Sequence, residues 1–347
     1  MSDAGEAVDV SVVVVTYESG PTLGRCLAAL KAQSIQGFEV LLSDNGSIDG
    51  AAQAAAAANP GLVLIENGSN IGFAAGNNRA AERARGPWLL LLNPDAYAEP
   101  GFIAALLQAA AAHPGARCFT ARQRMAENPS RLDGLGDAMT VIGFPFRGGY
   151  GQPDPGPMAA AEVFSPCGAA MMIDRALFLR MGGFDERFFC YYEDVDLGYR
   201  LRLAGETVLL APEAVVAHEG SVSTGGRRSD FSLYHGARNR LWLYVKDTPP
   251  VLFWLTLPFH VLATLGVWLR AATQGHSEPV ERGLEDAIKG LPAMLWSRRE
   301  IQAGRKASSE DIASMMVWNP LDALARIGRL RRPRSKPGAS SPRSGGP

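Results

Sequence analysis

Cysteine is scarce in this 347-residue sequence, and its four cysteines lie far apart. None of them forms a Cys-x-x-Cys pair or has a histidine at zinc-ligand spacing, which argues against a structural zinc site or a disulfide scaffold. The first nine residues contain no lysine or arginine and therefore lack the basic start of a secretory signal peptide. We expect a protein of the reducing cytoplasm.

Negative charge is missing from the end of the chain. Seven of the 34 lysine and arginine residues, and none of the 35 aspartate and glutamate residues, lie from Arg326 onward. This basic segment has no aromatic residue on which a base could stack, so we expect no nucleic acid as a partner. Hydrophobic residues make up 47% of the chain and charged residues 20%, which is typical of a globular protein rather than a disordered chain or a coiled-coil rod.

Short apolar runs alternate with helical patterns in the first third of the chain. The run Val10–Val15 is β-branched except at Ser11, as is typical of a strand buried on both faces of a parallel sheet. The segment Pro21–Gln33 follows it with leucine and cysteine at helical spacing. The same alternation predicts strands at 39–43, 62–65 and 88–92 and helices at 48–58, 74–84 and 101–112. This order predicts an α/β fold with a mostly parallel sheet and helices on both of its faces.

The middle of the chain is less regular. Residues 125–157 are rich in glycine and proline and predict a long loop over one face of the sheet. After this loop we expect a strand at 168–174, a short helix at 194–204 and two short strands within 207–218.

Residues 251–269 carry no charge and are just long enough to span a bilayer. Pro258 and His260 at mid-segment also suit a bent or re-entrant hairpin in the membrane interface, with Trp254 and Trp268 at headgroup level. A core helix or an oligomer contact is the third interpretation. We expect membrane contact of some form from a helical C-terminal region.

Polar residues directly follow three of the apolar runs. They are Thr16, Tyr17 and Glu18 after the first run, Asp44 and Asn45 after the second, and Asn93 and Asp95 after the run at 88–92. Ligands of such sheets bind beyond the carboxyl ends of the strands. A carboxylate or amide there can accept the imide N–H of a pyrimidine base while an aromatic ring stacks on the base. The alternative is that Asp44 and Asn45 only cap the next helix.

The small residues of Asn70–Asn78 allow a phosphate to approach the backbone at the start of a helix. The segment is not Gly-x-Gly-x-x-Gly, which argues against a dinucleotide-dependent dehydrogenase. The loop Thr16–Pro21 contains no lysine or arginine to hold a triphosphate, which argues against a nucleotidyltransferase.

Four side chains carry groups suited to catalysis. Asp95 ends an apolar run, where a carboxylate suits a hard divalent cation. His218 follows another apolar run; a lone histidine there is more often structural, but together with Asp95 it would leave coordination positions open for phosphate oxygens. Glu193 and Asp194 are adjacent like charges, so at least one pKa should be raised, which suits a general base near neutral pH. The alternative is an acidic first helical turn favoured by the helix dipole.

Seven segments occur in a characteristic order. They are SVVVVTYES, SDNGS, NIGFAAGNN, LLLLNPDA, GAAMMIDR, GGFDERFFCYYEDVDLGYRLRLAG and AHEGSVS. As an ordered set they resemble family 2 inverting glycosyltransferases of the GT-A fold, in particular the bacterial rhamnosyltransferase-like branch that builds surface polysaccharides. The resemblance covers about residues 10–246.

The resemblance implies a role for each matching position. It implies a nucleoside site at Thr16, Tyr17, Glu18, Asp44 and Asn45, ribose and diphosphate contacts from Asn70, Gly72, Gly76, Asn77, Asn78 and Asn93, and a donor-sugar contact at Gly168 and Ala169. It also implies that Asp95 and His218 hold Mg²⁺ or Mn²⁺, that Asp194 is the general base with Glu193 beside the acceptor, and that Ser221–Arg228 is a lid. Two positions depart from the family pattern: Asn93 stands where the first Asp of an Asp-x-Asp motif is usual, and Asn77 replaces a frequent arginine.

The implied activity is a metal-dependent, inverting sugar transfer. The resemblance favours dTDP-rhamnose as donor, with a UDP-hexose second, and a hydroxyl of a growing, lipid-linked bacterial polysaccharide as acceptor. The apolar segment 251–269 and the basic cluster Arg329–Arg334 favour a peripheral or monotopic location at the inner face of the cell membrane, and a homo-oligomer stays open. The alternative is a non-catalytic scaffold that binds the nucleotide sugar within an assembly complex.

Four regions are expected along the chain. They are an N-terminal extension at 1–9, a GT-A catalytic domain at 10–247, a helical and membrane-interfacial region at 248–328, and a basic disordered tail at 329–347.

Overall fold

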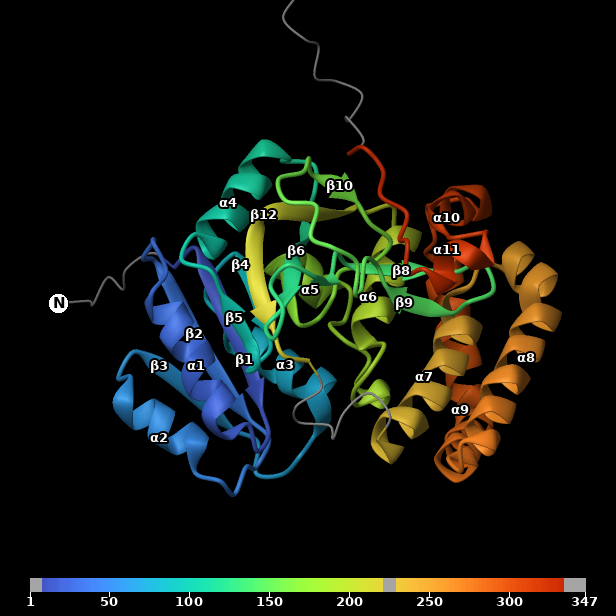
Figure 1. Ribbon diagram of the computed structural model, residues 1–347, viewed down its shortest axis with the longest axis horizontal. Helices are drawn as coiled ribbons and strands as arrows, with labels where there is room; N and C mark the ends of the chain where they lie inside the picture. The colour runs from blue at the N-terminus through green and yellow to red at the C-terminus, as the bar shows by residue number, and fades with distance from the viewer. Residues whose placement is uncertain (1–7, 221–228, 334–347) are drawn as a thin grey trace, which may run out of the picture.

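The computed structural model describes residues 8–220 and 229–333, so the expected lid at 221–228 lies outside the described residues. A mixed sheet lies at the centre with helices on both faces, and a second group of helices packs on one side (Figure 1). The strands are β1 (Val10–Thr16), β2 (Phe38–Asp44), β3 (Leu62–Glu66), β4 (Trp88–Leu92), β5 (Ala96–Ala98), β6 (Cys118–Met125), β7 (Leu132–Gly134), β8 (Asp137–Met139), β9 (Pro145–Arg147), β10 (Ala161–Glu162), β11 (Ala170–Asp174) and β12 (Val208–His218). The helices are α1 (Gly20–Lys31), α2 (Ala51–Ala58), α3 (Gly72–Arg83), α4 (Phe102–Ala112), α5 (Arg175–Arg180), the 3₁₀ turn Glu186–Phe188, α6 (Glu193–Leu203), α7 (Asp230–Asp247), α8 (Pro250–Thr273), α9 (Ser277–Ala303), α10 (Ser309–Met315) and α11 (Pro320–Leu324).

The sheet brings the ends of distant strands to one edge. Its order is β10-β12-β6-β11-β4-β1-β2-β3, with β5 beside β12 and β7 beside β6. β1 runs parallel to β2 and β4, and β12 runs parallel to β6. β11 lies antiparallel between β4 and β6, so β4 and β6 point the same way. The carboxyl ends of β1, β2, β4 and β12 therefore open at the same edge, and the expected α/β fold class is confirmed.

The apolar residues of β1 alternate between the two faces of the sheet, as the period of two in a strand requires. Val12 and Val14 pack in a cluster with residues of α1 and α4. Val13 and Val15 pack on the other face with residues of α3, α5 and α6. Because both faces are covered by helices, every residue of β1 is buried.

Helix α6 connects the sheet to the C-terminal helices. Leu197 and Leu201 belong to the cluster under the sheet, whereas Val195, Tyr199 and Leu203 pack with residues of α7, α9 and α10. This two-sided burial fixes the position of the first turn of α6.

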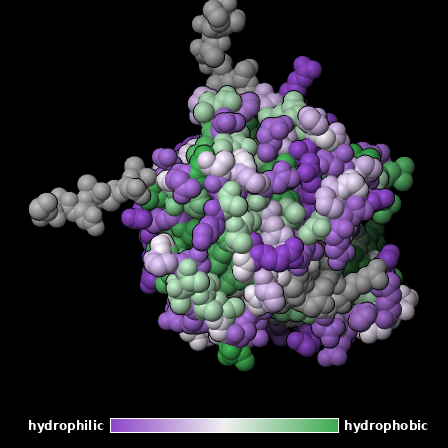
Figure 2. All heavy atoms as spheres, turned by 60° about the vertical axis from the view of Figure 1, so that its left-hand side comes forward, coloured by the Kyte–Doolittle hydropathy of each residue, from purple (hydrophilic) through white to green (hydrophobic). Residues whose placement is uncertain are grey.

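The side of the molecule that carries α1 and α2 lies opposite the C-terminal helices (Figure 1). Polar and apolar residues are interspersed on its surface (Figure 2).

Several local predictions differ from the structure. The expected helix at 48–58 begins only at Ala51, because Gly50 has a left-handed backbone. The two strands expected in 207–218 are the single strand β12, which carries a register shift between Ala211 and Val215. The loop expected at 125–157 contains the short strands β7, β8 and β9. The first residues of the expected basic tail are ordered, since Arg331 exchanges two backbone hydrogen bonds with Glu162 of β10.

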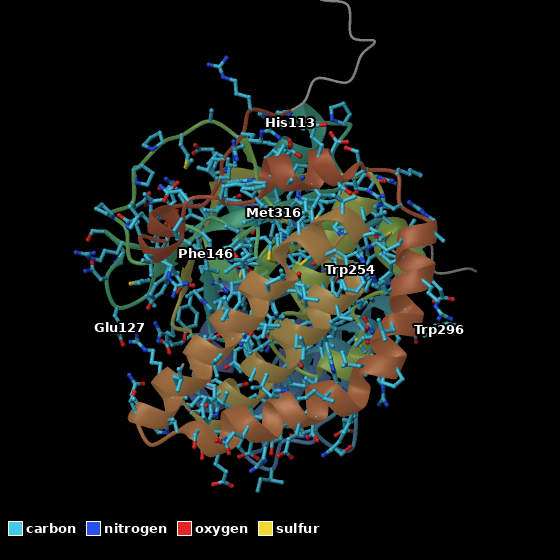
Figure 3. The ribbon with its side chains drawn as sticks, turned by 90° about the vertical axis from the view of Figure 1, so that its right-hand side faces the viewer. His113, Glu127, Phe146, Trp254, Trp296 and Met316 are labelled. Carbon is cyan, nitrogen blue, oxygen red and sulfur yellow. The ribbon has the colours of Figure 1, made fainter. Side chains whose placement is uncertain are left out.

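The apolar segment 251–269 lies within one helix, α8, that contains Pro258. Of the alternatives for this segment, a re-entrant hairpin within 251–269 is therefore wrong. Among the described residues α8 is the one helix whose length and composition would allow it to cross a membrane. Figure 3 faces α8 and α9 and labels Trp254 and Trp296, whose side chains are 71% and 61% exposed.

Candidate active site

A cavity of about 680 Å³ opens at the edge of the sheet where β1, β2 and β4 end. Residues expected to act together line it although they lie far apart in the sequence. From the predicted set these are Tyr17, Asn45, Asn70, Gly72, Asn93, Asp95, Gly168, Ala169, Glu193, Asp194 and His218. Two of their oxygens, Asn93 Oδ1 and Glu193 Oε2, are buried without a hydrogen-bond partner among the described residues, so they are open to a ligand.

Three predicted nucleoside residues hold the loops around the cavity and do not line it. The Thr16 hydroxyl donates to Ser19 Oγ at 2.8 Å. The carboxylate of Asp44 accepts the hydroxyl and the backbone N–H of Ser47, within the turn that follows β2. It does not cap the next helix, because the N-cap of α2 is Gly50 and no side chain caps it. Glu18 Oε1 accepts the N–H of Ile48 at 3.3 Å, and the Glu18 N–H donates to Ser47 Oγ at 2.9 Å.

Three positions of the predicted diphosphate segment are used for packing instead. A side chain at Gly76 would come within 2.8 Å of Val15, so α3 can approach β1 only with glycine there. Asn77 is buried and donates to the carbonyl of Phe73 within its own helix at 2.9 Å. The amide of Asn78 exchanges hydrogen bonds with the backbone of Phe184. Only the start of the segment, at Asn70, Gly72 and Phe73, lies on the cavity.

Asp95 and His218 meet at the base of the cavity. Asp95 follows β4, His218 ends β12, and Nε2 of His218 lies 3.3 Å from Oδ1 of Asp95. On the other side of the ring, Nδ1 of His218 lies 2.8 Å from Oδ2 of Asp133. Burial alone would lower the pKa of His218, but the hydrogen bonds to Asp133 and Asp95 outweigh it and raise the pKa to about 9. Asp133 thus orients the imidazole toward Asp95.

A half-buried arginine extends this chain of charges. Nη1 of Arg147 lies 2.9 Å from Asp133 Oδ2, and its Nε lies 2.9 Å from Asp137 Oδ1. Burial raises the pKa of Asp137 to about 7, against the lowering effect of Arg147. These side chains therefore form one series of contacts from Asp95 through His218, Asp133 and Arg147 to Asp137. All of them except Asp133 line the cavity.

Glu193 and Asp194 form the first turn of α6 and face the cavity. Asp194 accepts the N–H of Gly168 at Oδ2 (2.7 Å) and the N–H of Val195 at Oδ1 (2.8 Å). Burial raises the pKa of Asp194, while these N–H groups and the charge of Arg147 act to lower it. Burial, and then the neighbouring Asp194, raise the pKa of Glu193 far more. The pKa of Glu193 is therefore raised more than that of Asp194, so Asp194 is the more acidic group of the pair.

A strained turn places this acidic pair. Phe189, Tyr191 and Tyr192 have φ angles of 67°, 70° and 71°, which side chains rarely adopt. The amide of Asn239 on α7 holds the turn by donating to the carbonyls of Phe188, Cys190 and Tyr191 at 2.7 to 2.9 Å. A side chain at Gly72 would collide with Phe189 at 2.6 Å, so only glycine lets α3 reach this turn.

Asp95 and His218 fit a divalent cation that takes the place of the Nε2 proton, because Asp133 can keep the other proton on Nδ1. Ligand atoms on adjacent positions of an octahedral ion lie about 3 Å apart, close to the 3.3 Å between Asp95 Oδ1 and His218 Nε2. Asp137, Cys167 and Asp194 also have ligand atoms within 4.8 Å of one another. That cluster fits a metal less well, because Arg147 already pairs with Asp137 and burial raises the pKa of the Cys167 thiol.

Sequence reasoning missed Asp133, Asp137 and Arg147. All three lie in the glycine- and proline-rich segment that the sequence predicts to be a loop, on or beside strands of three residues. The available signal was an isolated charge between apolar and glycine residues, as in Leu132–Met139. Charges in such a segment need buried partners, but the sequence does not show which ones.

Comparisons with known proteins place the chain among glycosyltransferases. A profile described as Glycosyl transferase family 2 matches residues 11–178. The N-acetylglucosaminyl-diphospho-decaprenol L-rhamnosyltransferase of Mycobacterium tuberculosis is 37% identical over 237 residues, which cover 62% of this chain and 77% of that protein. The O-antigen biosynthesis protein RfbC of Myxococcus xanthus is 27% identical over 92% of this chain and 25% of its own length.

Solved structures share the fold at low sequence identity. S. aureus TarS 1-349 in complex with UDP-GlcNAc has a TM-score of 0.56 at 17% identity, covering 88% of this chain and 91% of that one. The mannosyltransferase PcManGT from Pyrobaculum calidifontis, in complex with GDP-Man and Mn²⁺, has a TM-score of 0.52 at 18% identity and covers 90% and 88%.

Proposed function

The chain belongs to glycosyl transferase family 2, and from this premise we propose that it transfers rhamnose, with inversion, from dTDP-rhamnose to a hydroxyl of a lipid-linked sugar. The observation that carries the proposal is the convergence of Asp95, His218 and Asp194 on one cavity. The rhamnosyltransferase relative supports the choice of sugar and acceptor, and a UDP-hexose is the second donor.

The nucleotide binds on the side of the cavity where β1 and β2 end. Tyr17 offers an exposed ring to the base, while Asn45 and Asn70 offer amides from neighbouring loops. Asp95 and His218 would hold Mg²⁺ or Mn²⁺ beside the diphosphate. When bound, such an ion supplies positive charge against the leaving nucleotide diphosphate.

Asp194 acts on the acceptor. Its carboxylate takes the proton of the acceptor hydroxyl while that oxygen attacks the anomeric carbon from the face opposite the nucleotide. The N–H groups of Gly168 and Val195 keep the carboxylate in place during the transfer. Burial raises the pKa of Glu193, which favours its protonated form. Its Oε2 has no hydrogen-bond partner among the described residues, so the carboxyl group can hydrogen-bond to the acceptor sugar. One displacement inverts the configuration of the transferred sugar.

Helix α8 supplies a surface for the membrane that carries such an acceptor. Leu255, Phe259 and Leu262 are 66%, 59% and 64% exposed, although apolar side chains are stabilised by burial. We therefore place the protein at a membrane surface, with α8 in the interface.

A transfer assay tests the proposed function. The purified chain is incubated with dTDP-rhamnose or a UDP-hexose, a sugar diphosphate on a short isoprenoid chain, and either Mn²⁺ or a chelator. We expect rhamnosyl transfer that needs the metal, and NMR should show the opposite anomeric configuration in product and donor. Transfer with retention contradicts the mechanism, and nucleotide binding without transfer to any acceptor supports the scaffold alternative.

A further inference from the structure

The side of the cavity away from the ends of β1 and β2 is built partly by the C-terminal segment. Arg326, which follows α11, lines the cavity together with Phe146 of β9. Its guanidinium lies 6.0 Å from the centre of the Phe146 ring. The backbone is fixed there because the carbonyl of Arg326 accepts the N–H of Gly149 at 2.7 Å and the carbonyl of Ala325 accepts Gln152 Nε2 at 2.8 Å.

The backbone at Arg326 favours a different residue. Arg326 has a φ angle of 58° and directly follows the C-cap of α11, a position at which glycine is usual because it has no Cβ. An arginine there lowers stability unless its side chain contributes something else. A strained position beside a cavity points to a function of the side chain.

The charge of Arg326 is available. Of the two arginines that line the cavity, Arg147 is committed to the carboxylates of Asp133 and Asp137. Arg326 forms no ion pair with another residue in the ranges 8–220 and 229–333. A guanidinium at a cavity wall with no carboxylate partner is suited to an anionic ligand such as a phosphate.

The surroundings of Arg326 fit an amphiphilic ligand. A second cavity of about 250 Å³ meets the first at Asp137 and Arg326. Its walls include the apolar side chains of Leu132, Leu135, Val163, Phe164, Ile327 and Leu330. The cation therefore lies between the catalytic cavity and a smaller cavity whose walls are more apolar.

We propose that Arg326 binds the diphosphate of the lipid-linked acceptor, whose apolar chain continues past it toward the second cavity. The proposal rests on the proposed function, in which the nucleotide occupies the side with Tyr17 and Asn45 and the accepting hydroxyl lies at Asp194. The phosphate attached to the acceptor sugar then lies beyond Asp194, on the side of Arg326. The positive charge recognises the diphosphate, and the apolar walls exclude a fully polar acceptor.

The test uses a substitution that suits the backbone. In Arg326→Gly the cation is lost while the left-handed position gains its preferred residue, so thermal stability should be equal to wild type or higher. We expect KM for the short-chain sugar diphosphate to rise about 10- to 100-fold, the range for a lost charge-assisted hydrogen bond, with kcat and the donor KM nearly unchanged. Arg326→Lys keeps the charge and should recover most of the loss.

Two controls separate this role from others. Arg332→Gly removes the same charge from an exposed position of the same segment that lines neither cavity, and it should leave the acceptor KM unchanged. An alkyl glycoside of the acceptor sugar, which has no phosphate, should be used equally by wild type and Arg326→Gly.

Three results would overturn the inference. They are an unchanged KM in Arg326→Gly, an equal rise with the alkyl glycoside, and an equal rise in Arg332→Gly, which would indicate attraction of the whole basic segment to anionic headgroups. If wild type transfers no sugar to a lipid-linked diphosphate, the proposed function itself fails and this inference with it.

Discussion

Arg147 is the residue whose charge connects the two halves of the site. It pairs with Asp133, which orients His218, and with Asp137, and its charge also acts on Asp194. An uncompensated charge is costly when buried, so the acids and the arginine depend on one another. The positions of the metal-side histidine and of the base are thereby coupled through one guanidinium.

The pH profile tests this coupling. Because Arg147 lowers the pKa of Asp194, Arg147→Gln should raise that pKa, and the base should stay protonated to higher pH. In the pH profile of kcat, we expect the acid limb to shift to higher pH by about one unit. Arg147→Lys retains the charge and should keep the limb near its wild-type position. An unmoved limb in a folded Arg147→Gln protein, checked by circular dichroism, would contradict the coupling.

Residue types, together with the family resemblance, predict Asp95, His218 and Asp194 as the reacting groups. Asp95, His218 and Asp194 each follow or begin a regular element, and the structure brings all three to the cavity. Asn77 and Asn78 show the limit of this reasoning, because a loop-helix segment can face either a ligand or its own neighbours. Only the packing of α3 against β1 and Phe184 determines which face is used.

At the scale of elements, α7 positions the turn before α6. Asn239→Ala would remove the donor that the carbonyls of Phe188, Cys190 and Tyr191 use. We expect the free energy of unfolding to fall by about 2 kcal/mol and kcat to fall about tenfold or more, because Asp194 loses its fixed position. Denaturant unfolding and steady-state kinetics measure both quantities.

Asn59→Ala is the matched control for this substitution. Asn59 also donates to a backbone carbonyl, at 2.8 Å, but at the end of α2. This variant should lose some stability and keep wild-type kcat. Equal kcat in both variants would show that the turn does not depend on Asn239.

Helix α8 is held to the body by a buried neutral histidine. His260 donates from Nδ1 to the carbonyl of Ile142 at 2.8 Å and stacks on Tyr244 with ring centres 3.9 Å apart. Burial lowers the pKa of His260 from its ordinary value of 6.5 to about 4. Its contribution to stability is therefore complete above pH 6.5 and is lost as pH falls toward 4.

The expected loss can be measured by unfolding at two pH values. Between pH 7 and pH 5 the free energy of unfolding should fall by up to about 2 kcal/mol more in wild type than in His260→Gln, which does not titrate. Thermal or denaturant unfolding of both proteins at each pH gives the difference. Equal pH dependence in the two proteins would show that His260 is not protonated more readily on unfolding.

The sequence predicted long elements better than short ones. The strand at 88–92 was predicted to the residue, because a run of leucines bounded by turn residues fits few structures besides a buried strand. The strands β7, β8 and β9 have three residues each, too few to show a period. The direction of β11 depends on which strand it pairs with, and a short apolar run does not contain that information.

At the scale of the whole molecule, α8 faces outward next to the catalytic body (Figure 3). We expect the protein to bind anionic lipid vesicles and to move with them to the top of a density gradient in a flotation assay. The double substitution Leu255→Ser and Leu262→Ser should weaken this binding about tenfold or more, since each leucine contributes roughly 1.5–3 kcal/mol when buried. Val63→Ser, at a partly exposed position on β3, is the control. A wild-type protein that stays monomeric in solution and ignores the vesicles would contradict membrane contact.

The central claim is that Asp194 acts as the base on a sugar donor held beside Asp95 and His218. The most direct measurement is the turnover of Asp194→Asn relative to wild type, with donor affinity determined by calorimetry on the same preparations. We expect turnover to fall about 100-fold or more while donor affinity stays the same, because the amide keeps the shape of the carboxylate but cannot take the proton. Turnover within about tenfold of wild type, at unchanged donor affinity, would contradict it.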